Sequence, residues 1–120
     1  MVSARVTAAL CSGEYGAKYR ALTSGEMLQL NNWIEFDAVN LMGATFLTDF
    51  YKVRWRVTNT DKVASYADAL RGNFYLSDTG GTSRREYTSY RGVHFVEAFV
   101  IRKRDSKLSA KSEPFYVVIE

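Results

Sequence analysis

Apolar and polar residues alternate with a period of two along much of this chain, and this pattern predicts β-strands. The clearest example is the segment YKVRWRVT. Its alternate positions fall on opposite faces of a strand, with Tyr51, Val53, Trp55 and Val57 on one face and Lys52, Arg54, Arg56 and Thr58 on the other. One apolar face and one charged face are typical of a strand that is buried on one side only.

Other segments follow a weaker form of the same pattern. They predict strands at Arg5–Leu10, Ala17–Leu22, Trp33–Val39, Gly72–Leu76, Val93–Ile101 and Pro114–Ile119. The segment Val93–Ile101 is apolar on both faces, as expected for a central strand of a packed sheet. Helical patterns are scarce. Lys62–Leu70 is the best candidate, and Val39–Asp49 is weaker because it contains Gly43 and β-branched residues.

These short strands predict an all-β fold, an antiparallel immunoglobulin-like β-sandwich of about seven to eight strands. A small barrel is the alternative, because alternation alone does not decide whether a sheet closes on itself. The chain has 120 residues, no internal repeat and no linker-like segment. We therefore expect a single domain over residues 1–120.

Composition and charge narrow the class of protein and the compartment. The net charge of +3 is compatible with a phosphate-bearing partner, but it is too small to favour extended nucleic-acid binding. Cys11 is the single cysteine, which excludes an internal disulfide and fits a reducing compartment. Neither a membrane-spanning apolar run nor a signal-peptide core is visible in the sequence. We expect a cytoplasmic protein with no membrane partner.

Catalytic and metal-binding motifs are absent from the sequence. His94 and Cys11 are the single histidine and cysteine, so a zinc site would lack its usual ligands. The Gly80-Gly81 step resembles neither a phosphate-binding loop nor a dinucleotide fingerprint. We therefore expect no enzyme activity, no metal and no cofactor.

The densest group of polar residues lies in the segment RREYTSYRGVHFVEAF, which predicts two strands around a turn at Gly92. Arginines are suited to binding phosphate oxygens in a bidentate way, and aromatic rings stack on bases. The residues of interest for a nucleotide are Arg71, Arg84, Arg85 and Arg91 for phosphates, Tyr87, Tyr90 and His94 for stacking, and Asn59 for reading a base edge.

A structural interpretation of the same residues competes with this one. Trp55 lies on the apolar face of its strand, where a tryptophan usually belongs to the core, and basic rows on strands are usually solvated. His94 is flanked by apolar residues and needs hydrogen-bond partners, for which Glu86, Thr88 or Glu97 are possible acceptors. The polar set would then be an internal network that holds the sandwich together.

Four motifs occur in a particular order along the chain. They are WRVTNT from Trp55 to Thr60, RGNF from Arg71 to Phe74, REYTSYRGVH from Arg85 to His94, and PFYV from Pro114 to Val117. In order, spacing and residue type they resemble the adenylyl/guanylyl cyclase and SMODS C-terminal sensor domain. The resemblance is clearest from Phe36 to Ile119. The positions that match the family pattern are Trp55, Asn59, Arg71, Gly72, Glu86, Thr88, Tyr90, Gly92, His94 and Glu97.

The resemblance implies a β-sandwich that is attached to nucleotide-synthesising enzymes of bacterial antiphage signalling. Its implied role is to sense a nucleotide or another infection cue and to control an associated nucleotidyltransferase or nucleotide cyclase. No nucleotidyltransferase segment is visible in this chain, so we expect an excised domain or a stand-alone sensor.

Two hypotheses follow for this chain. In the first it is a ligand-binding sensor, whose candidate site residues are Trp55, Asn59, Arg71, Arg85, Glu86, Thr88, Tyr90 and His94. In the second it is an interaction module that docks on a partner enzyme or a phage protein through a sheet face or an edge strand, without a small-molecule ligand.

Overall fold

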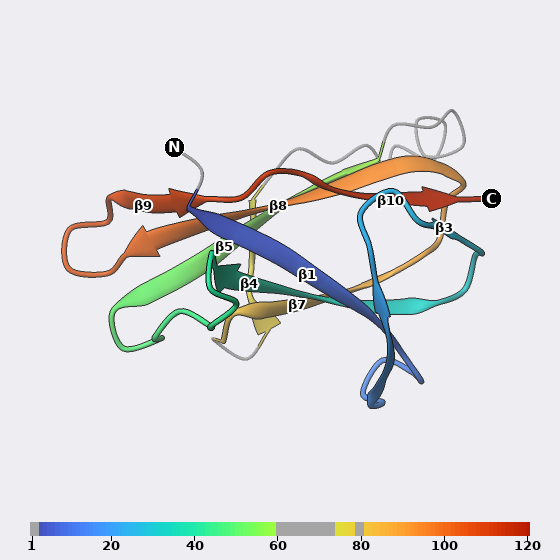
Figure 1. Cartoon of the computed structure of the whole chain (residues 1–120), viewed down its shortest axis with the longest axis horizontal. Coiled ribbons are helices and arrows are strands. Elements are labelled where there is room, and N and C mark those ends of the chain that lie inside the picture. Colours follow the sequence, from blue (N-terminus) through green and yellow to red (C-terminus); the bar gives the residue numbers. More distant parts are fainter. Residues whose placement is uncertain (1–2, 60–73, 79–80) are drawn as a thin grey trace.

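A computed structural model describes residues 3–59, 74–78 and 81–120 of the chain, and within these residues ten β-strands form two sheets. The smaller sheet has four strands, in the order β2 (Lys18–Leu22), β1 (Ala4–Cys11), β4 (Trp33–Asn40) and β7 (Ser83–Tyr87). Figure 1 shows β4 and β7 of this sheet below β8 and β10 of the other.

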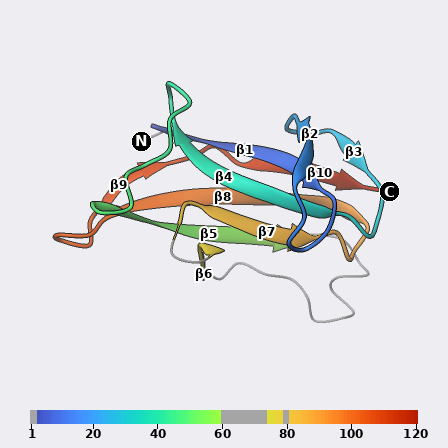
Figure 2. The same ribbon diagram turned by 90° about the horizontal axis from the view of Figure 1, so that it is seen from below.

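The larger sheet has six strands. Its order is β3 (Met27–Leu28), β10 (Phe115–Ile119), β8 (Gly92–Arg102), β5 (Tyr51–Asn59) and β6 (Phe74–Leu76), with β9 (Leu108–Lys111) also paired to β8. All pairs are antiparallel except β3 with β10. Figure 2 shows that β6 and β7, the edge strands of opposite sheets, lie on the same side of the molecule.

The two layers confirm the predicted all-β sandwich, and the immunoglobulin-like connectivity stays a prediction. The expected strands are present, although Gly72 lies outside the described residues. The count of seven to eight strands was too low, because β3 and β9 escape the pattern. The first has only two residues, and the second (LSAK) contains one buried side chain. Strands this short contain too few residues for a period-two alternation to be recognised in the sequence.

The expected weak helix at Val39–Asp49 is wrong, and the other candidate, Lys62–Leu70, lies outside the described residues. Strand β4 continues to Asn40, whose Oδ1 accepts hydrogen bonds from the backbone N–H groups of Met42 (2.9 Å) and Ala44 (3.0 Å). Gly43 follows with a φ of +87°, a left-handed conformation that glycine adopts without strain. The side chain and the glycine together make a turn and prevent a helix.

The core lies between the sheets and is organised by strand β5. Its Val53, Trp55 and Val57 are buried, as the alternation predicted, and Trp55 has no exposed surface. The Trp55 indole N–H donates to Ser77 Oγ (3.0 Å), and this hydroxyl donates to the Val53 carbonyl oxygen (3.0 Å). Trp55 therefore belongs to the core, and its one polar atom has the partner that a buried indole requires.

The opposite face of β5 carries the predicted basic row on the outer surface of the larger sheet. Arg56 is the best-defined member. Its Nε donates to Glu97 Oε1 (3.1 Å), and its guanidinium lies 5.5 Å and 5.3 Å from the ring centroids of Phe74 and Phe99. Lys111 also approaches Glu97 (3.7 Å). Arg56 is thus part of an ion-pair and cation–π cluster.

No helix in the described part of the chain has the length and apolarity that a membrane crossing requires.

Replacing Trp55 by phenylalanine tests its place in the core. Trp55→Phe removes buried volume and leaves the Ser77 hydroxyl without its indole donor, so we expect a loss of about 1–3 kcal/mol in the free energy of unfolding. Urea denaturation measures this loss. Trp33→Phe is the matched control, since Trp33 is half-buried and rests on the Tyr87 ring, and it should cost less than about 1 kcal/mol. Equal losses would contradict this description of the core.

Candidate functional site: a pocket between the two sheets

A pocket of about 360 Å³ opens between the two sheets, at the end of the sandwich where β5 ends and β8 begins. This volume lies near the lower end of the range for small-ligand sites. The described residues that line it come from both sheets and are Ile34, Phe36, Val57, Asn59, Glu86, Tyr87, Thr88, Ser89, Tyr90, His94, Val96, Val117 and Ile119. The pocket therefore combines apolar walls from the core with a group of polar side chains.

The register of the larger sheet explains why polar residues meet at this end. His94 of β8 pairs with Asn59 of β5 and with Val117 of β10. All three follow the alternation of the buried positions, so they face the smaller sheet. The inward positions Val57 and Val96 are apolar, and the next ones along are Asn59 and His94. The polar pair therefore ends the core and begins the pocket.

His94 carries the most informative geometry of the site. Its Nε2 lies 2.7 Å from the backbone carbonyl oxygen of Tyr90. Because a carbonyl only accepts hydrogen bonds, Nε2 must carry the proton, and in the neutral ring Nδ1 is then a bare acceptor. The predicted side-chain acceptors for His94 (Glu86, Thr88 or Glu97) are therefore wrong for this bond, since a backbone group provides it.

The second ring nitrogen of His94 has no hydrogen-bond partner among the residues that the structure describes, and it is buried. The whole residue is 9% exposed. Buried polar atoms in proteins are nearly always hydrogen-bonded, and an unsatisfied one costs about 1–3 kcal/mol. His94 is also one of the residues that line the pocket, so this imidazole is a candidate contact for a ligand.

Glu86 and Arg84 belong to β7, the edge strand of the smaller sheet, which lies on the same side of the molecule as β6, the edge strand of the larger sheet (Figure 2). Arg84 Nε donates to Glu86 Oε2 (2.7 Å). The same guanidinium donates to the Leu76 carbonyl oxygen (2.9 Å) and lies 4.6 Å from the ring centroid of Tyr75. Leu76 and Tyr75 belong to β6, the edge of the larger sheet. Arg84 thus joins the two sheets at their edges, and it holds the Glu86 carboxylate at the pocket wall.

Thr88 has a mainly structural position. Its hydroxyl accepts from the Asn32 backbone N–H (2.8 Å) and donates to the Gln29 carbonyl oxygen (3.1 Å). Backbone hydrogen bonds join Thr88 to Asn31 and Asn32 as well. These contacts attach the end of β7 to the segment before β4, so Thr88 holds in place the stretch that carries Ser89 and Tyr90.

The structure brings together five of the eight candidate site residues of the sensor hypothesis and separates the others; Tyr87, which was also predicted to stack, lines the pocket as well. Those that line the pocket are Asn59, Glu86, Thr88, Tyr90 and His94. Trp55 lies in the core. Arg85 lies on the outer face of the smaller sheet, where its Nε donates to Glu35 Oε1 (3.0 Å) and its Nη1 to the carbonyl oxygens of Gly13 (3.1 Å) and Glu14 (2.8 Å). Arg71 lies outside the described residues.

Sequence reasoning missed two features of the site. Arg84 was one arginine among several, and only the pairing of β7 with β4 shows that it turns toward the other sheet while Arg85 turns away. The apolar walls were also missed, although alternation does identify Ile34 and Phe36 as inward positions. Within the described ranges, no group of three or more histidine, cysteine, aspartate or glutamate residues is arranged to hold a metal ion.

With the fold and the pocket in view, comparison with known families identifies the class of protein. The pattern of the Adenylyl/Guanylyl and SMODS C-terminal sensor domain matches residues 3–120. The chain belongs to this family of sensor domains, as its motifs predicted. Among curated proteins, none matches the sequence.

The bridge between Arg84 and Glu86 can be tested by paired substitutions. Arg84→Met removes a charged hydrogen-bond donor from the largely buried Glu86 carboxylate, so we expect a loss of about 1–3 kcal/mol in the free energy of unfolding. Adding Glu86→Gln removes the carboxylate charge that Arg84 stabilised and should restore part of the loss. Lys18→Met is the control, because Lys18 pairs with Glu35 from a side chain that is 53% exposed, and it should cost less than about 1 kcal/mol. Equal costs for Arg84→Met and Lys18→Met in urea denaturation would exclude a bridging role.

Proposed function

We propose that this domain is a non-catalytic sensor of a bacterial antiphage second-messenger system, which binds a nucleotide in the pocket between its sheets. Through this ligand it controls an associated nucleotidyltransferase or nucleotide cyclase in the cytoplasm. The observation that carries the proposal is the pocket itself. It combines apolar walls with a buried histidine whose Nδ1 has no partner among the described residues. Membership of a sensor-domain family agrees with this role.

The residues of the pocket have distinct parts in the proposal. Tyr90 and His94 contact the base or the ribose, and the amide of Asn59 can both donate and accept at a base edge. Glu86 and Thr88 shape the wall. Trp55 supports β5 from the core, and Arg85 stabilises the opposite face of the smaller sheet.

A panel of mononucleotides, cyclic nucleotides and oligonucleotides tests the sensor proposal by thermal denaturation of the 120-residue chain. A ligand at a hundred times its Kd should add about 2.7 kcal/mol of stability, which raises the Tm by several degrees. Tyr90→Ala should remove the shift, because Tyr90 lines the pocket. Tyr116→Ala is the matched control on the outer face of β10 and should keep it. A panel without any shift would contradict the nucleotide sensor.

One observation favours the second candidate function, an interaction module. The loop between β4 and β5 exposes four large apolar side chains, here called the tip patch: Leu41, Met42, Leu47 and Phe50. Met42 is 93% exposed. Exposed apolar groups of this kind are typical of protein-binding sites. Docking through a sheet face or an edge strand stays a prediction, and this loop is a further candidate surface.

Basic residues flank the tip patch. The Lys103 N–H donates to the Phe50 carbonyl oxygen (2.9 Å), which places the turn between β8 and β9 beside the patch. Lys103 and Arg104 are exposed there. Arg102 forms an ion pair with Asp105, and the hydrogen bonds that Arg102 donates lower the pKa of the Asp105 carboxyl. A partner surface with an apolar groove and an acidic rim would complement this end.

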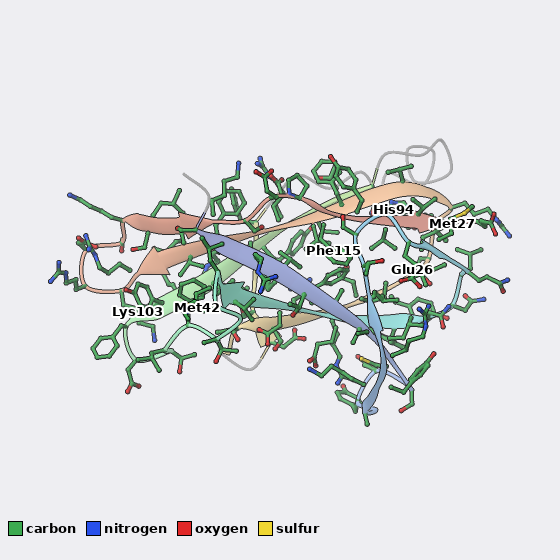
Figure 3. The ribbon with its side chains drawn as sticks, in the orientation of Figure 1. Glu26, Met27, Met42, His94, Lys103 and Phe115 are labelled. Carbon is green, nitrogen blue, oxygen red and sulfur yellow. The ribbon has the colours of Figure 1, made fainter. Side chains whose placement is uncertain are left out.

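The tip patch and the pocket lie at opposite ends of the sandwich. Figure 3 shows Met42 and Lys103 at one end and His94 toward the other. A partner enzyme on the tip patch would therefore leave the pocket open to a ligand, so the two candidate functions are compatible in one sensor.

A charge placed in the tip patch tests docking. Met42→Glu should leave the Tm unchanged and weaken binding of the chain to its associated nucleotidyltransferase or cyclase by at least about tenfold, because a carboxylate would enter an apolar contact. Isothermal titration measures the affinity. Tyr15→Glu is the control, since Tyr15 is 92% exposed on the turn after β1. Equal binding by both variants would exclude the tip patch as the docking surface.

A further inference from the structure

We infer that the ligand enters the pocket base first, with an N–H-bearing edge of a nucleobase directed at His94 Nδ1, and that its phosphate groups stay outside the pocket. This inference rests on the proposed function. It specifies which part of a nucleotide the site recognises and in which orientation the nucleotide binds.

The tautomer of His94 decides which ligand chemistry fits. The Tyr90 carbonyl oxygen requires a proton on Nε2, so Nδ1 of the neutral ring presents a lone pair. The ring faces the same space as Asn59 and Val96, which also line the pocket. A lone pair is satisfied only by a donor. The amino and imino groups of nucleobases and the hydroxyls of ribose are such donors, whereas an ionised phosphate has only acceptor oxygens. The apolar wall of the pocket favours the base over the ribose.

The charge of the pocket wall also disfavours a phosphate inside the pocket. Among the described residues that line the pocket there is no lysine or arginine, and the one carboxylate is that of Glu86. Arg84 is the cation that holds this carboxylate, through a hydrogen bond of 2.7 Å. From the described part of the wall, a phosphate inside would therefore meet a carboxylate and a lone pair and no cation, and burying it without a counter-charge is costly. Arg85, the neighbouring cation in sequence, is turned to the outer face.

The remaining wall suits the flat faces of a base. Ile34, Val57 and Val96 are buried core residues that border the pocket. Tyr90, which also borders the pocket, supplies an aromatic ring, and rings of this kind stack on bases. Apolar walls with a few oriented polar groups are the usual composition of a small-ligand site.

Titration of the whole chain with adenosine, guanosine, cytidine and uridine, each beside its 5′-monophosphate and beside inorganic phosphate and pyrophosphate, tests the orientation. A nucleoside should bind within about tenfold of its monophosphate, because the phosphate contacts only solvent-screened groups. Inorganic phosphate and pyrophosphate should not compete with the nucleoside.

The hydrogen bond to His94 is tested by changing the base of the nucleoside that binds. Each N–H of that base is replaced in turn, by removing the amino group or by N-methylation, and one replacement should cost about tenfold to a hundredfold in affinity. In His94→Phe, whose fold is checked by its Tm, the same replacement should cost far less, because the acceptor is absent. If His94→Phe does not fold, the ligand series with the unchanged chain still decides.

The outcomes separate the two proposals. If monophosphates bind and nucleosides lose more than about a hundredfold, the phosphate anchors the ligand, and the orientation proposed here is wrong while the sensor role stands. If no N–H replacement changes the affinity, the proposed orientation is likewise wrong and the sensor role still stands. If neither nucleosides nor nucleotides bind, the nucleotide-sensor proposal and this inference both fail.

Discussion

The antiparallel register between β5 and β8 is the constraint on which the rest of this structure depends. It sets Trp55, the largest fully buried side chain, beside Ala98 on the neighbouring strand of the same sheet, so that a large ring lies next to a small residue. The same register carries on to the pair Asn59 and His94. Because side chains alternate strictly along a strand, the residues that fill the core and the residues that form the pocket belong to one inward face. A shift of one residue would turn both sets outward together.

At the pocket, this inward face carries polar residues that do not add to the stability of the core. A sandwich of this size is held by its apolar core, and a buried, unsatisfied imidazole nitrogen lowers that stability. Thr88, Arg84 and Glu86 compensate by fixing the strand ends around it with hydrogen bonds to both sheets. The polar residues of the motif thus have two roles. Some hold the frame, and His94 and Asn59 line the pocket inside it.

Much of this arrangement is visible in the sequence, for a clear physical reason. Alternation in β5 predicted that Trp55 is buried and that Arg56 is not, and the family motifs pointed to Asn59, Glu86, Thr88, Tyr90 and His94. The segment Ser83–Tyr87 was different, because nearly all its residues are polar or large and no apolar face identifies the inside. Arg84 and Arg85 are neighbours in sequence and point to opposite faces, and only the pairing with Ile34 and Phe36 of β4 decides which one reaches the other sheet.

Ligand recognition in this pocket depends most directly on the position of the proton on His94, the single histidine of the chain. Its two ring nitrogens can therefore be assigned without ambiguity by ¹H–¹⁵N correlation NMR of the imidazole, at a pH where the ring is neutral. We expect the proton on Nε2, an unprotonated Nδ1, and a change of the Nδ1 resonance when a binding nucleoside is added. A proton on Nδ1, or an Nδ1 resonance that the bound nucleoside leaves unchanged, would contradict a pocket that recognises its ligand through this acceptor.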